Sequence, residues 1–105
     1  MTPIRCILLA LVALALCAPV LAAEDEGHAR ELINALGCKG CHSLGENGGN
    51  LGPPLTGVGS RLVREAIHLQ IVNPKGNNPA SMMPAYDYLP EADIEALTDY
   101  LKSLR

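Results

Sequence analysis

The residues with the clearest chemistry form a run of five, Cys38-Lys39-Gly40-Cys41-His42, in which two thiols stand three positions apart and a histidine follows directly. Thiols at this spacing on one helical turn lie on the same side and can bond to two neighbouring vinyl groups, while the next side chain ligates a metal beneath them. The run therefore predicts one haem c, attached covalently through Cys38 and Cys41, with His42 as an axial ligand of the iron.

Two other uses of a cysteine pair fit this chain less well. A zinc site needs two further ligands, and outside the run residues 24–105 offer only His28 and His68. A thioredoxin-like redox pair needs a strand and a parallel sheet, and the sequence has no strand pattern. A haem-free metal or thiol module is thus the weaker alternative, and a red colour of the purified protein, which indicates haem, would refute it.

The second axial ligand is expected from the segment Met82-Met83-Pro84, because thioether sulfur stabilises ferrous iron. Adjacent side chains of an extended segment point to opposite sides, so only one methionine can reach the iron. Pro84 restricts the residue before it to extended geometry, which favours Met83 over Met82. His68 and His28 are rival ligands, but helical geometry predicts that both are surface residues.

Three stretches have the apolar period of a helix, at residues 26–36, at residues 61–72 and from Pro90 onward. Loops rich in glycine and proline separate them, and no strand pattern is present. The chain also lacks Phe and Trp, so a buried haem would supply apolar volume that the side chains do not. These features predict an all-α domain of three to four helices wrapped around one haem.

The first 23 residues have the pattern of a secretory signal. Arg5 precedes an uncharged apolar stretch that ends in small residues, which predicts cleavage after Ala22 or Ala23. The mature domain would then be residues 24–105, located in the periplasm. The alternative is an uncleaved segment that anchors the protein to a membrane, since eighteen uncharged residues can just span a bilayer.

Charge is unevenly distributed along residues 24–105, which carry seven Lys or Arg and eleven Asp or Glu, a net charge of −4. This balance implies no nucleic-acid partner. Nine of the acidic residues lie toward the two ends, whereas the middle has only Glu46 and Glu65 against four basic residues, Lys39, Arg61, Arg64 and Lys75. The pattern predicts that the haem edge meets an acidic patch on a redox partner protein. The protein itself is expected to be a monomer.

The chain resembles the class I monohaem cytochromes c over essentially all of residues 24–105, because its motifs follow one another in the order found in that family. The resemblance is carried by the attachment run, by Gly52-Pro53-Pro54-Leu55, by Met83-Pro84 and by the closing helix. It implies a small helical cytochrome c fold in which the first and last helices cross nearly at right angles. Ala29 and Ile33 would then meet Leu97 and Tyr100, although the family often has glycine and an aromatic residue where this chain has Ala29 and Ile33.

The resemblance also implies roles for single residues. The carbonyl group of Pro53 would accept a hydrogen bond from His42 and orient the imidazole. Arg61 would pair with a haem propionate, or else be an exposed arginine at a helix start near Glu65. Two further side chains would line the haem crevice, Tyr86 and Tyr88.

The function expected from these residues is that of an exported electron carrier rather than an enzyme. With His42 and Met83 both bound to iron, no coordination site is left for oxygen or peroxide chemistry. The alternative is a haem-based peroxidase or gas sensor, which requires the bond from Met83 to be weak or absent.

Overall fold

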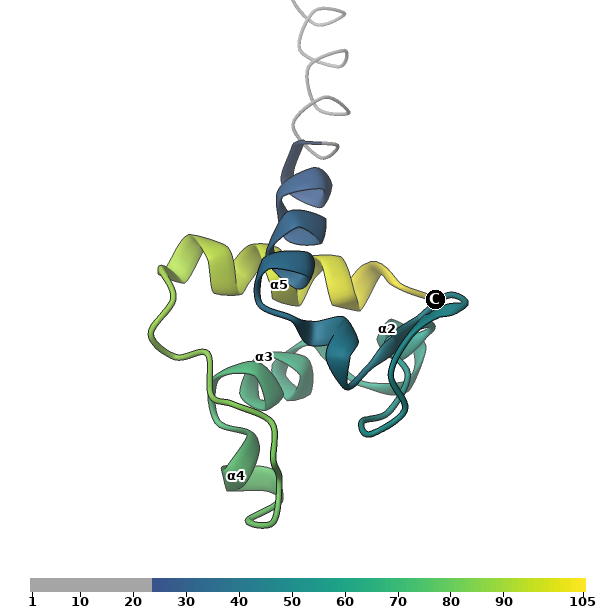
Figure 1. Ribbon diagram of the computed structural model, residues 1–105. Helices are drawn as coiled ribbons and strands as arrows, with labels where there is room; N and C mark the ends of the chain where they lie inside the picture. The colour runs from purple at the N-terminus through teal and green to yellow at the C-terminus, as the bar shows by residue number, and fades with distance from the viewer. Residues whose placement is uncertain (1–23) are drawn as a thin grey trace, which may run out of the picture.

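The computed structural model describes residues 24–105 (Figure 1). The signal segment predicted at residues 1–23, and the choice between its cleavage and its retention as an anchor, lie outside the described residues. Within residues 24–105, no helix has the length and apolar character needed to cross a membrane.

The described chain is helical except for one short strand pair. The first helix covers residues 24–35, and the later elements are η1 (Cys38–Gly40), β1 (Ser43–Leu44), β2 (Asn47–Gly48), α2 (Val58–Arg61), α3 (Arg64–Val72), α4 (Pro74–Asn77) and α5 (Glu91–Ser103). The strands pair antiparallel, with Ser43 opposite Gly48. The predicted helical class is confirmed, and the pair is too short to produce an alternating pattern in the sequence.

The expected crossing of the first and last helices is present, with the first helix running across the middle of α5 (Figure 1). Ala29 and Ile33 are 0% and 1% exposed, and they belong to one apolar cluster with Leu97 and Tyr100. The Arg30 guanidinium lies over the ring of Tyr100, 5.8 Å from its centroid, and its Nε donates a hydrogen bond to the tyrosine hydroxyl. The crossing therefore fixes where the first helix ends and where the attachment run begins.

The helix predicted over residues 61–72 is interrupted, which corrects that expectation. Arg61 ends α2, Leu62 and Val63 are extended, and α3 starts afresh at Arg64. Periodicity could not detect this break, because apolar residues on both sides of it keep the helical spacing.

The break follows from how α2 docks on the end of α5. A Cβ on Gly59 would lie 1.9 Å from the carbonyl oxygen of Lys102, so only glycine permits this approach. The Lys102 ammonium donates to the carbonyl oxygens of Gly59 and Leu62, which satisfies the carbonyl groups at the end of α2. A further difference is α4, one turn at the start of a predicted loop, where the Asn73 side chain accepts a hydrogen bond from the backbone N–H of Gly76.

Candidate functional site

The two cysteines of the attachment run lie on and just after a single 3₁₀ turn. Gly37 has φ +74°, which lets the chain turn sharply out of the first helix into η1. The carbonyl oxygen of Cys38 then accepts hydrogen bonds from the backbone N–H groups of Cys41 and His42, at 3.2 and 3.0 Å. Both thiols are free. Partial burial raises the pKa of the Cys38 thiol, whereas Cys41 is exposed.

The imidazole of His42 is held by its backbone surroundings. Its Nδ1 lies 2.6 Å from the carbonyl oxygen of Pro53, the contact implied by the resemblance. A carbonyl oxygen can only accept, so Nδ1 carries the proton and Nε2 has a lone pair available for a metal. The ring rests on Gly52, where a Cβ would lie 2.4 Å from its Cε1 atom.

The glycine-rich loop after His42 is fastened to the attachment run by backbone hydrogen bonds. Gly49 donates to Lys39, Gly52 to Cys41, and Leu55 to Ser43, at 2.8 to 2.9 Å. A loop so rich in glycine and proline has little regular secondary structure to hold it in place. These hydrogen bonds hold the loop against the attachment run, and no periodic pattern in the sequence predicts them.

Of the two candidate methionines, only Met83 is directed inward. Met82 is 83% exposed, whereas Met83 is partly buried against the same apolar cluster as Cys38. The sulfur of Met83 also lies 3.5 Å from Nε2 of Gln70, an amide on α3 that can donate to it. Sequence reasoning missed Gln70, because a single polar residue on a helix gives no hint of its distant partner.

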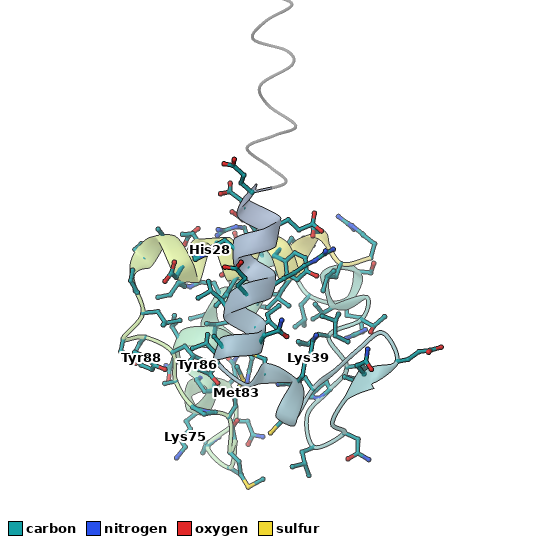
Figure 2. The ribbon with its side chains drawn as sticks, turned by 45° about the horizontal axis from the view of Figure 1, so that its top comes forward. His28, Lys39, Lys75, Met83, Tyr86 and Tyr88 are labelled. Carbon is teal, nitrogen blue, oxygen red and sulfur yellow. The ribbon has the colours of Figure 1, made fainter. Side chains whose placement is uncertain are left out.

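Tyr86 ties the methionine segment to the end of the first helix. Its backbone N–H donates to Ile71 on α3 at 2.9 Å, and its hydroxyl donates to the carbonyl oxygen of Leu36 at 3.4 Å. Burial, and then the nearby thiols of the attachment run, raise the pKa of Tyr86. Figure 2 shows Tyr86 and Met83 beside the end of the first helix. Tyr88, by contrast, is 70% exposed, with its ring centroid 6.2 Å from that of Tyr86.

Arg61 braces the segment that holds His42. Its Nη1 donates to the carbonyl oxygen of Thr56 at 2.8 Å, and its Nη2 donates to that of Pro54. One guanidinium therefore fixes the carbonyl groups of two residues that follow Pro53 in the same segment. No ion pair joins Arg61 to Glu65 in the described part of the chain.

The two rival histidines each face a carboxylate of α5. Nε2 of His28 lies 2.8 Å from Asp93, and Nε2 of His68 lies 3.8 Å from Glu95. His28 has a half-exposed side chain, as predicted for a surface residue, and His68 is about one-third exposed.

The basic residues of the middle segment have different surroundings. Arg64 pairs with both Glu95 and Asp99, so its charge is largely offset by α5. Lys39 is partly buried and lines a hollow with Arg30 and Tyr100, whereas Lys75 on α4 is exposed. Figure 2 shows the two lysines on well-separated parts of the domain.

The donor set fits a covalently attached haem with two axial ligands. It comprises two thiols on one turn, an imidazole whose orientation leaves Nε2 available, and a thioether packed on the apolar cluster that also contains one of the thiols. Several apolar side chains are left largely exposed in the chain itself, among them Leu51, Met82 and Tyr88. Burial of this apolar surface against a porphyrin would be favourable, because the core contains few aromatic side chains.

Comparison with known proteins agrees with this donor set. The family model described as "Cytochrome c" matches residues 28–105. A cytochrome c oxidase subunit 2 from Alkalihalophilus pseudofirmus is 34% identical over 84 residues, which cover 72% of this chain and 25% of that protein. The chain thus spans about a quarter of the length of this relative. No solved structure gives a significant match.

Proposed function

The chain belongs to the cytochrome c family, and we propose that it is an exported carrier of single electrons on one haem c. Proteins of this family bind haem c covalently and generally act as electron carriers. In the proposal, Cys38 and Cys41 attach the haem, and His42 and Met83 ligate its iron.

The observation that carries the proposal is the position of Met83. Its sulfur is partly buried against the cluster that includes Cys38, and Tyr86, three residues later, is hydrogen-bonded to the end of the first helix. Met83 thus packs on the same apolar cluster as Cys38, although it lies about forty residues further along the chain. A core methionine with no other role would more often lie on the apolar stripe of a helix.

The chain's own residues would orient both ligands. Pro53 fixes the tautomer and direction of the His42 ring, and the hydrogen bond makes the imidazole a stronger electron donor. Gln70 donates toward the sulfur of Met83 and so restricts its rotation. When bound, the haem supplies an iron that takes up and releases one electron. Because hydrogen bonds from the chain would hold both side chains in place, we expect electron transfer to need little reorganisation of the ligands.

Replacing the two methionines separately tests the ligation. In ferric, haem-loaded protein, Met83→Ala should abolish the methionine-to-iron charge-transfer band in the visible spectrum, and Met82→Ala should leave it intact. The second variant is the matched control, because it removes the same side chain at the exposed neighbouring position. Loss of the band in Met82→Ala, or its survival in Met83→Ala, would contradict the assignment. A high-spin ferric spectrum of the unchanged protein would instead support the peroxidase or gas-sensor alternative.

Export and covalent attachment are tested together by the intact mass of the purified protein. The proposal expects a chain cleaved after Ala22 or Ala23 that carries one haem. A mass that retains the first 23 residues would favour an anchored protein. The partner in the proposal is a redox protein with an acidic docking patch, and the similarity to an oxidase subunit makes a terminal oxidase the first acceptor to assay.

A further inference from the structure

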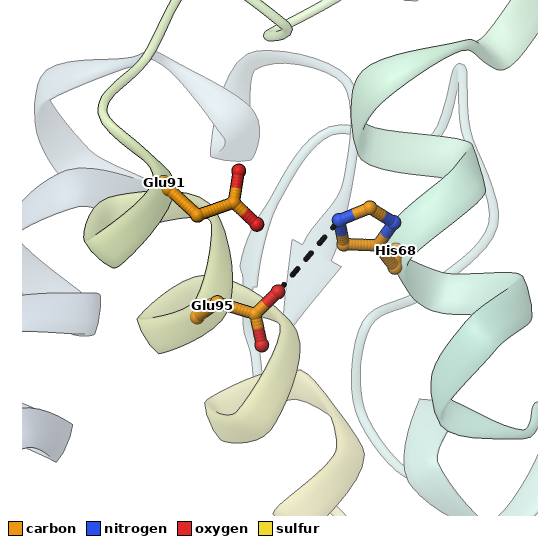
Figure 3. Close-up of side chains that lie close together, drawn as sticks. All are labelled: His68, Glu91 and Glu95. Atoms are coloured by element: carbon orange, nitrogen blue, oxygen red, sulfur yellow. Dashed lines mark ion pairs between the residues drawn. The ribbon is translucent and has the colours of Figure 1, made fainter.

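A second group of metal-ligating side chains lies between α3 and α5, apart from the attachment run. His68 comes from α3, and Glu91 and Glu95 come from the first two turns of α5 (Figure 3). One ligand atom from each residue lies within 4.8 Å of the other two, and Nε2 of His68 is already 3.8 Å from Oε1 of Glu95.

The two helices hold these side chains in a fixed relation. Glu91 and Glu95 are four residues apart and therefore share one face of α5. Beneath them the two helices bury apolar residues in one cluster, Ile67 and Ile71 from α3 with Leu97 and Leu101 from α5. The backbone positions of all three ligand residues are thus set by core packing rather than by a mobile loop.

Arg64 orients one of the carboxylates. Its Nη2 binds Oε2 of Glu95, which leaves Oε1 directed at His68. Its Nε binds Asp99 at 2.7 Å, so the guanidinium charge is already balanced by a further carboxylate. Arg64 therefore restrains Glu95 in the same way that hydrogen bonds restrain the carboxylate ligands of metal sites.

We propose that His68, Glu91 and Glu95 form a binding site for Zn²⁺ that joins α3 to α5. An imidazole with two carboxylates is a donor set typical of zinc, whereas magnesium and calcium prefer oxygen ligands alone. Three protein ligands leave the fourth tetrahedral position to water. Zinc bonds of about 2.0 Å place ligand atoms roughly 3.3 Å apart. His68 and Glu95 are near that separation at 3.8 Å, so the larger inward movement, about 1 Å or more, falls on Glu91, which is exposed and can change rotamer.

A bound ion would restrain the segment that carries Met83. That segment leaves the end of α3 at Asn73 and enters α5 at Glu91. The metal site would therefore link the two helices that flank the segment. Metal binding to the folded state alone should also stabilise the fold by mass action. The site uses none of the residues assigned to the haem, so it stands or fails independently of the proposed function.

Titration calorimetry with Zn²⁺ on the haem-loaded protein tests the site. The unchanged protein should bind one ion and melt at a higher temperature in its presence. His68→Gln and Glu91→Gln should each weaken binding by roughly tenfold or more and abolish the shift in melting temperature. Glu91 is preferred to Glu95 for this test because Glu95 also pairs with Arg64.

His28→Gln is the matched control, because His28 also faces a carboxylate of α5 but lies outside the cluster. It should bind Zn²⁺ like the unchanged protein. Three results would overturn the proposal: no binding at millimolar Zn²⁺, unaltered binding by a folded His68→Gln or Glu91→Gln variant, or loss of binding in His28→Gln. Circular dichroism establishes that each variant is folded.

Discussion

Gly52 should tolerate a side chain poorly, because it lies directly against the imidazole of His42. A Cβ at this position would lie 2.4 Å from Cε1 and 2.7 Å from Nδ1 of His42, where ordinary contacts are 3.4 to 4 Å. In Gly52→Ala the ring must therefore retreat by about 1 Å, because the three atoms nearest to the new methyl group all belong to it. Nδ1 is 2.6 Å from Pro53, and a shift of that size away from it breaks the hydrogen bond.

The expected cost follows from that lost contact. A broken hydrogen bond that leaves a partly buried group unsatisfied lowers the free energy of unfolding by about 1–3 kcal/mol. The imidazole also becomes a weaker donor, which stabilises ferric iron less, so the reduction potential should rise. Both changes should appear in the same variant, because they have one cause.

The assay is denaturant unfolding of the haem-loaded protein, followed by haem absorbance, together with a redox titration. Gly27→Ala is the control, since a Cβ there meets nothing within 4 Å and Gly27 lies inside the first helix. The control should be stabilised by roughly 0.5–1 kcal/mol, as alanine favours helix over glycine. If Gly52→Ala unfolds at the same denaturant concentration as the unchanged protein and keeps its potential, the reasoning about the His42 cradle is wrong.

Two further predictions concern charge. The hydrogen bond to Asp93 raises the pKa of His28 above its ordinary 6.5. The stability that this pair contributes is therefore complete below pH 6.5 and is lost as the pH rises through the raised pKa. His28→Gln should destabilise the protein at pH 5.5 and have little effect at pH 9, and equal effects at the two pH values would refute this prediction. Lys75→Glu should slow electron transfer to an acidic partner at low salt and have no effect on the rate at high salt. Lys39→Glu, at a partly buried position, should slow the transfer less. A rate that does not respond to Lys75→Glu would refute the docking model.

Helix periodicity predicted the first helix and α5 with their apolar stripes, and the resemblance to cytochromes c implied their crossing, but neither predicted the path between the two helices. Ala29 and Ile33 lie on one stripe, and their burial against α5 is what an apolar stripe requires. The break at Leu62 and Val63 has another origin, the close approach of Gly59 to the end of α5. That contact joins residues about forty positions apart, so no local pattern could have predicted it.

In the site, too, local patterns predicted some residues, whereas contacts between distant segments could not be predicted. Cys38, Cys41 and His42 were accessible to sequence reasoning because one turn brings them together, and Pro84 distinguished Met83 from Met82 by a local restriction of the backbone. Contacts made by Gln70 or Arg61 depend on where distant segments meet. For Arg61 the sequence left open a propionate partner or an exposed position, and neither alternative included the hydrogen bonds to Pro54 and Thr56.

The loop after the attachment run is better understood as a scaffold than as a linker. Side chains are excluded at three of its glycines because each touches the run: Gly48 at the carbonyl group of His42, Gly49 at that of Gly40, and Gly52 at the His42 ring. Arg61 then fixes the far end of the loop through Pro54 and Thr56. The direction of the His42 imidazole is thus set by the backbone of this loop. A segment rich in glycine and proline can therefore orient the proposed axial ligand without regular secondary structure.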